Sequence, residues 1–129
     1  MLNNKGQSLV LFIILLPILL LFLILILDIG KLILIKNELS SINNIVMDYG
    51  LSNLDKDNLE DELVKIIKLN KDDIDNIDVT VEDGKIYITM NEKVNGIFTS
   101  FIDIPIFNIK LVYVGYIDNN VNRIERMGV

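Results

Sequence analysis

The sequence contains no cysteine and no histidine among its 129 residues. Without cysteine the chain can form no disulfide and offers no thiolate nucleophile. Without histidine it lacks the general base of the serine and cysteine triads, and the two absences together remove the ligands of nearly every zinc site. Several classes of enzyme are thereby excluded. The lack of cysteine does not assign a compartment, because exported domains without disulfides also exist.

Positive charge is also scarce. Twelve Lys and Arg residues face 18 Asp and Glu residues, which gives a formal net charge of −6. Most of the excess negative charge falls between Asp55 and Lys85. Binding to nucleic acid requires a basic patch, and so does lying flat on anionic lipid. We therefore expect no nucleic-acid partner.

Charge is absent altogether from residues 9–27, which read LVLFIILLPILLLFLILIL. More than about 18 consecutive apolar residues can cross a bilayer core of roughly 30 Å as a helix. Each Leu, Ile, Phe or Val at mid-span favours insertion by roughly 0.3 to 0.6 kcal/mol. Pro17 removes one backbone hydrogen bond, which transmembrane helices tolerate. This stretch therefore predicts a transmembrane helix in contact with membrane lipid.

Two other interpretations of this stretch are disfavoured. A buried core helix would need a larger domain around it than a chain of this length provides. A cleaved secretory signal has an apolar region of about 7 to 15 residues and a small-residue cleavage site. The apolar run is longer than that, and Asp28-Ile29-Gly30-Lys31 is not such a site.

The helix is expected to continue past the apolar span. Residues 28–49 contain no proline, and Gly30 is their only glycine. We predict one helix from Ser8 to Tyr49, roughly 60 Å long at 1.5 Å per residue, with Gly50 as its C-terminal cap. Its apolar residues after the span step by three and four positions, which is a heptad seam. The seam consists of Leu32, Ile35, Leu39, Ile42, Val46 and Tyr49.

The seam allows two interpretations, between which the sequence does not choose. It can pack on the small domain of its own chain, or it can also pack on like helices in a bundle or filament. A second helix is predicted from a cap at Asp55 or Asp57 through Lys68, with acids in its first turn and lysines in its last. Its apolar face consists of Leu59, Leu63, Ile66 and Ile67.

The clearest local signal is a β-hairpin around Asp83-Gly84. This dipeptide stands between two segments of alternating apolar and polar residues, which is typical of a type I′ turn. A two-residue loop pairs Glu82 with Lys85, which carry opposite charges, and it places three apolar pairs on one face of the sheet. Those pairs are Val81 with Ile86, Val79 with Ile88 and Ile77 with Met90.

Residues 94–129 predict a segment that crosses between strands, then a third strand and a tail. Residues 94–101 (VNGIFTSF) indicate a short helix or an irregular crossing, which Pro105 ends. Residues 107–117 predict a strand that lies centrally and is covered on both faces, because both of its faces are apolar. The tail, residues 118–129, is expected to be frayed or peripheral. The two faces carry Ile109, Leu111, Tyr113 and Ile117 on one side, and Val112, Val114 and Tyr116 on the other.

The fold class that follows is α+β. A long N-terminal transmembrane helix continues into a small domain with one further helix and a three-stranded, mostly antiparallel sheet. The predicted boundaries are a leader at residues 1–8, the transmembrane helix at 9–27, its membrane-proximal continuation at 28–50, and a small acidic domain at 51–129.

No metal, cofactor or catalytic site is predicted. An EF-hand loop that started at Asp73 would place Ile77 and Asp78 where Asp and Gly are required. The group Asp72, Asp73, Asp75 and Asp78 is therefore interpreted as a solvated acidic linker. No carboxylate pair stands beside a recognisable nucleophile or phosphate loop, and the domain is too small to enclose much of a pocket, so an enzyme is not expected.

The N-terminal residues carry a family pattern. Lys5-Gly6-Gln7-Ser8 precedes the apolar span, Leu9, Val10, Phe12 and Pro17 lie within it, and Asp28-Ile29-Gly30-Lys31 closes it. This order resembles the N-terminus of TadE-like proteins, which are pilin-like (pseudopilin) components of tight-adherence pilus assembly and secretion systems, related to type IV pilins. The motif covers about a quarter of the chain, and the later order of elements is similar in architecture only.

The resemblance implies how the chain would be processed and oriented. A prepilin peptidase would cut between Gly6 and Gln7 on the cytoplasmic face. The chain would be a single-pass protein of the cell membrane, with a cytoplasmic N-terminus and an extracellular C-terminal domain. Its partners would be other pilin-like subunits, the pilus assembly machinery and the peptidase. Charge counting does not give this orientation, because Lys31 and Lys36 after the span outnumber Lys5 before it.

Leu11 departs from the family pattern. The family usually has Glu at the fifth position after the cut, and in pilins that Glu is thought to pair with a neighbour's N-terminal amine. A charge in lipid is costly and is kept only for a purpose, so its loss points to a minor or priming subunit. The alternative is a single-pass, membrane-anchored extracellular binding protein unrelated to pili. A membrane-tethered enzyme is a third class.

Overall fold

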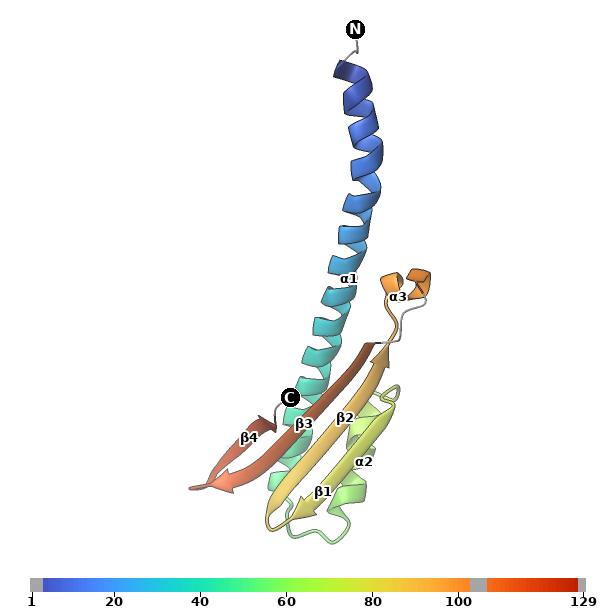
Figure 1. Cartoon of the computed structure of the whole chain (residues 1–129). Helices are drawn as coiled ribbons and strands as arrows, with labels where there is room; N and C mark the ends of the chain where they lie inside the picture. Colours follow the sequence, from blue (N-terminus) through green and yellow to red (C-terminus); the bar gives the residue numbers. More distant parts are fainter. Residues whose placement is uncertain (1–3, 103–106, 128–129) are drawn as a thin grey trace.

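The computed structural model describes residues 4–102 and 107–127, and it shows a sheet packed on one end of a long helix (Figure 1). The fold is α+β, as predicted. Its elements are α1 (Asn4–Leu51), α2 (Leu59–Asn70), β1 (Asn76–Glu82), β2 (Lys85–Val94), α3 (Ile97–Ile102), β3 (Phe107–Asp118) and β4 (Val121–Met127).

Helix α1 is continuous over 48 residues and is longer at both ends than predicted. Pro17 lies inside it without ending it. The apolar stretch in its N-terminal half is not buried anywhere in the molecule, and α1 is long and apolar enough to cross a membrane. Figure 1 shows this half extending away from the sheet, whereas the C-terminal half packs against it. One helix is thus exposed and apolar at one end and part of a folded core at the other.

The sheet has four strands in the order β1-β2-β3-β4, and all neighbours are antiparallel. The prediction of three strands was wrong, because part of the tail forms β4. Asn119 and Asn120 adopt positive φ values of 50° and 64° and turn the chain so that Asp118 pairs with Val121. Asn tolerates this left-handed conformation better than most residues do. Strand β4 is peripheral, as an edge strand, but it is paired rather than frayed.

The predicted hairpin between β1 and β2 is confirmed in every pair. Asp83 and Gly84 form the turn with φ values of 53° and 74°. The ladder joins Glu82 to Lys85 and brings the three predicted apolar pairs opposite one another. The local turn chemistry therefore sets the register between β1 and β2.

The heptad seam of α1 packs on the chain's own sheet. Leu39, Ile42 and Val46 are buried in the core, and Ile35 and Tyr49 are half-buried against it. Leu32 is half-buried nearer the apolar N-terminal half of α1. This arrangement corresponds to the first of the two interpretations of the seam. Helix α2 joins the same core through Leu59, Leu63 and Ile67, with Ile66 half-buried beside them.

Two predicted helix ends were wrong. Helix α2 begins at Leu59, and neither Asp55 nor Asp57 caps it; Asn58 occupies the cap position without a side-chain hydrogen bond. The acids of the first turn and Lys68 in the last turn are where they were predicted. Gly50 lies inside α1 rather than after it. It is needed there because a Cβ would lie 2.6 Å from Ile86 Cδ1, so that the lack of a side chain lets the helix approach β2.

Strand β3 is central, as predicted, because it pairs with β2 on one side and with β4 on the other. Its coverage differs from the prediction. Leu111 and Tyr113 are buried on the face that packs against α1. On the opposite face Val112, Val114 and Tyr116 are only half-buried, and in the described part of the chain no helix covers them. Edge-to-edge pairing, rather than a second helical layer, makes this strand central.

A charged cluster ties α1, β2 and the α2–β1 connection together. Lys71 Nζ lies 2.9 Å from Asp73, 3.4 Å from Glu92 and 3.6 Å from Glu38. Glu92 is only 5% exposed. Burial raises the pKa of Glu92, and the neighbouring Lys71 ammonium opposes this shift without cancelling it. The hydrogen bond from Lys71 lowers the pKa of the exposed Asp73.

We predict that Gly50→Val destabilises the domain. Ile86 and Leu63 are fully buried, so the added side chain meets atoms that have no room to retreat. The free energy of unfolding should fall by about 1–3 kcal/mol. The measurement is thermal unfolding of the full chain in detergent, monitored through the near-ultraviolet circular dichroism of its tyrosines. Gly30→Val is the matched control, because open space surrounds that Cβ position. Equal losses in the two variants would contradict this packing.

We predict that Glu92→Gln stabilises the protein in a pH-dependent way. Since the pKa of Glu92 is higher in the folded chain, its ionised form lowers the free energy of unfolding at neutral pH. This cost disappears as the pH falls through the raised pKa, towards the usual value of 4.5. The gain from E92Q should therefore be largest near neutral pH and shrink in acid. Urea unfolding of the full chain across this pH range measures it.

Glu38→Gln is the control for this experiment, because it removes a more exposed partner of the same lysine. It should change the free energy of unfolding little at any pH, since exposed ion pairs contribute little. A gain from E92Q that did not vary with pH would contradict the role assigned to burial.

Candidate functional site

The candidate site is the junction where the apolar half of α1 meets the head, defined here as residues 51–127 of the described chain. Asp28 is 4% exposed, although it directly follows the exposed apolar span. Its Oδ1 accepts a hydrogen bond of 2.7 Å from the Ile97 N–H, and its Oδ2 accepts one of 2.9 Å from the Phe98 N–H. A carboxylate from α1 thus caps the N-terminus of α3, where unpaired N–H groups and the helix dipole favour negative charge.

Two further residues complete this contact. Lys31 lies one helical turn after Asp28 and donates a hydrogen bond of 2.8 Å from Nζ to the carbonyl oxygen of Asn95. Gly96 lies between the two attachments, and a Cβ there would be 2.5 Å from Asp28 Oδ2. Only glycine lets the backbone come this close. The carboxylate therefore holds N–H groups and the ammonium holds a carbonyl, on one short segment of the β2–α3 connection.

The other residues of the family pattern lie elsewhere on α1. Gly30 is exposed within the junction, with open space around its Cβ position. Gly6 is likewise in open space in the first turns. Leu11 and Phe12 are 63% and 57% exposed. The structure thus brings Asp28 and Lys31 of the pattern against the head. It leaves the early residues at the far end of α1, and these are Lys5, Gly6, Gln7, Ser8, Leu11, Phe12 and Pro17.

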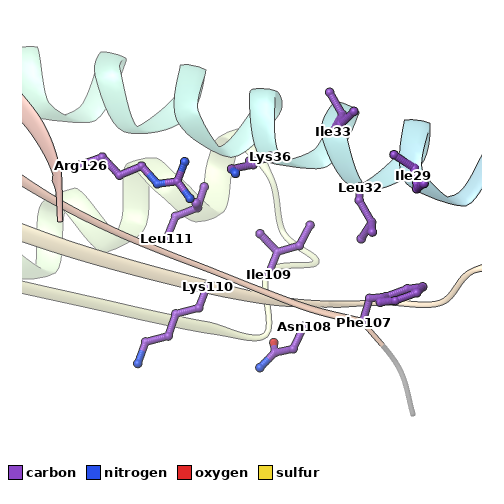
Figure 2. Close-up of a pocket in the computed structure, with 10 residues that line it drawn as sticks. All are labelled: Ile29, Leu32, Ile33, Lys36, Phe107, Asn108, Ile109, Lys110, Leu111 and Arg126. Atoms are coloured by element: carbon purple, nitrogen blue, oxygen red, sulfur yellow. The ribbon is translucent and has the colours of Figure 1, made fainter. Parts of the chain in front are cut away.

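An apolar groove of about 430 Å³ runs beside the junction, between α1 and β3. Figure 2 shows Leu32 of α1 pointing towards Phe107 and Ile109 of β3, with Lys36 and Arg126 towards one end of the groove. Within the described chain, neither of these two cations has a carboxylate within ion-pair distance. Such a groove suits an apolar chain better than a polar substrate. Its lining is Ile29, Leu32, Ile33, Lys36, Phe107, Asn108, Ile109, Lys110, Leu111 and Arg126.

A polar cluster lies at the opposite end of the head, around the turn from α1 to α2. Tyr49 donates its hydroxyl to Glu62, and Lys56 Nζ lies 3.0 Å from that hydroxyl and 3.3 Å from the carboxylate. The hydrogen bond from Tyr49 lowers the pKa of Glu62. This cluster fastens α2 to α1.

Among residues 4–102 and 107–127, no group of three or more His, Cys, Asp or Glu residues is arranged to hold a metal ion.

No family model, no curated protein and no solved structure matches this chain.

The sequence pattern located Asp28 and Lys31 but not the segment that they hold. Asp28 and Ile97 are 69 residues apart, so no local spacing joins them. The available signal was Asn95-Gly96 directly before the apolar hexapeptide IFTSFI, a turn-forming pair followed by a short helix. That signal indicates where a cap is needed, but it does not identify a distant carboxylate as the group that supplies it.

We predict that Asp28→Ala releases the start of α3. Without the carboxylate, the N–H groups of Ile97 and Phe98 lose their acceptor, and the loss of a cap costs about 0.5–2 kcal/mol. Hydrogen exchange at these two amides in the full chain should accelerate accordingly. Asp48→Ala is the matched control, because Asp48 is an exposed aspartate of the same helix. Unchanged protection in D28A would show that α3 does not depend on this contact.

Proposed function

We propose that this chain is a non-enzymatic, pilin-like membrane protein of the TadE-like type that acts in pilus assembly or adhesion. The observation that carries the proposal is the division of α1 into two halves. One half is exposed and apolar, and the other supplies the core of a small acidic head. A subunit built in this way can be stored in a bilayer by one half of its helix and present its head outside.

In this proposal the N-terminus is cytoplasmic and the head is extracellular. Gly6 and Gln7 form the processing junction, and both lie exposed in the first turns of α1, where a peptidase can reach them. The apolar span then holds the subunit in the membrane until it is extracted or packed with partners. Those partners are other pilin-like subunits and the assembly machinery, and the mechanism is assembly rather than catalysis.

The exposed side chain at position 11 supports a minor or priming role. Leu11 is 63% exposed on the apolar half of α1 and offers no carboxylate to a neighbouring subunit's amine. A subunit without that charge enters lipid at lower cost but lacks the pairing group of a major subunit. The same residue favours a second candidate, which is a membrane-anchored extracellular binding protein unrelated to pili. In that case the chain keeps its first residues.

We predict that a prepilin peptidase shortens this chain when the two are co-expressed. The intact mass and the N-terminal sequence of the membrane-extracted protein should give a chain that starts at Gln7. Gly6→Val should keep the full chain, because a branched side chain then precedes the scissile bond. Gly30→Val is the matched control and should be cut normally. A chain that starts at Met1 despite the peptidase would contradict processing and favour the anchored binding protein.

A further inference from the structure

Helix α3 has an uncharged, largely apolar sequence, and its first two side chains lie outside the core of the head. Its six residues read IFTSFI and carry no charge. Ile97 is 46% exposed and Phe98 is half-buried, and neither belongs to the hydrophobic core that α1, α2 and the sheet share. Among the described elements α3 packs on α1. Figure 1 shows it beside that helix and beyond the end of the sheet, on the side of the apolar half.

The contact with Asp28 fixes the height of α3 along α1. Asp28 follows immediately after the last residue of the uncharged span, residues 9–27. At a rise of 1.5 Å per residue, the carboxylate stands within a few ångströms of the point where that span ends. A span of this length matches a hydrocarbon core of roughly 30 Å, so its end marks the boundary of that core. The N-terminus of α3 is therefore held at the boundary between hydrocarbon and headgroups.

The surface of α1 just beyond the span also carries exposed apolar side chains. Ile29, Ile33 and Leu34 of α1 are 55%, 55% and 67% exposed, beyond the end of the span. The carboxylate of the junction is turned inwards, since Asp28 is buried and binds α3. The exposed Lys31 binds the carbonyl of Asn95. Apolar surface thus continues from the span onto the junction without an exposed carboxylate between them, within the described residues.

We propose that α3 is a second membrane contact, which lies in the interface of the same bilayer that α1 crosses. The side chains of Ile97 and Phe98 would rest at the boundary of headgroups and acyl chains, as those of interfacial helices do. A single spanning helix can tilt and slide, whereas two contacts joined through Asp28 set the height and tilt of the head. The partner is the lipid bilayer. The inference rests on the membrane-spanning part of the proposed function and not on a role in pili.

The absence of tryptophan from the chain makes the test direct, because one introduced tryptophan is the only such fluorophore. Three variants of the full chain are reconstituted in phosphatidylcholine vesicles. Ile97→Trp probes α3, Leu20→Trp probes the middle of the span, and Thr80→Trp probes an exposed position of β1 in the distal hairpin. Each is quenched separately by iodide in the water and by lipids brominated near the top of the acyl chain.

The proposal predicts that brominated lipid quenches I97W strongly and that iodide quenches it several-fold less than it quenches T80W. If iodide quenches I97W as strongly as T80W, α3 lies in water and the inference is overturned. If I97W resists both quenchers, protein rather than lipid covers α3, which also overturns it. L20W distinguishes failure of the α3 contact from failure of the membrane span, because iodide quenching at that position would overturn the span itself.

Discussion

Backbone groups inside hydrocarbon have no water to bind, and in the proposed membrane protein this constraint shapes the whole chain. A helix satisfies them internally, so the apolar span must be helical, and α1 carries that geometry without a break into the head. The surroundings of the side chains change along α1, whereas its backbone stays helical throughout. Exposed apolar side chains give way to the buried Leu39, Ile42 and Val46, against which the sheet and α2 fold. A domain of this size needs the C-terminal half of α1 to complete its hydrophobic core.

The change of environment is concentrated at the junction. A buried carboxylate is costly unless it is paired, and Asp28 is balanced by two backbone N–H groups at the start of α3 and by the dipole of that helix. Gly96 is what allows that approach. Asp28 and Lys31 therefore attach α1 to the connection between β2 and α3. They join parts of the chain that lie 69 residues apart.

Short-range chemistry made much of this fold predictable. The register of β1 and β2 follows from Asp83-Gly84 and from strict alternation, which are both local signals. Strand β4 was missed because its sequence, VNRIERM, has few apolar residues and its Asn119-Asn120 turn is a weaker signal than Asp-Gly. Gly50 resembles a cap in sequence, but its neighbours Ile86 and Leu63 arrive from other elements. The hydrogen-bond partners of Asp28 could not be predicted for the same reason, since a contact between residues far apart in the chain leaves no local sequence pattern.

The central claim is that one helix crosses the membrane and presents the head outside. Limited proteolysis of intact cells that produce the protein tests it most directly, with mass spectrometry to locate the cuts. The account predicts that an added protease removes peptides of the head from intact cells, while residues 9–27 stay protected in the membrane. A head that resists the protease until the cells are lysed would place it in the cytoplasm and contradict the account.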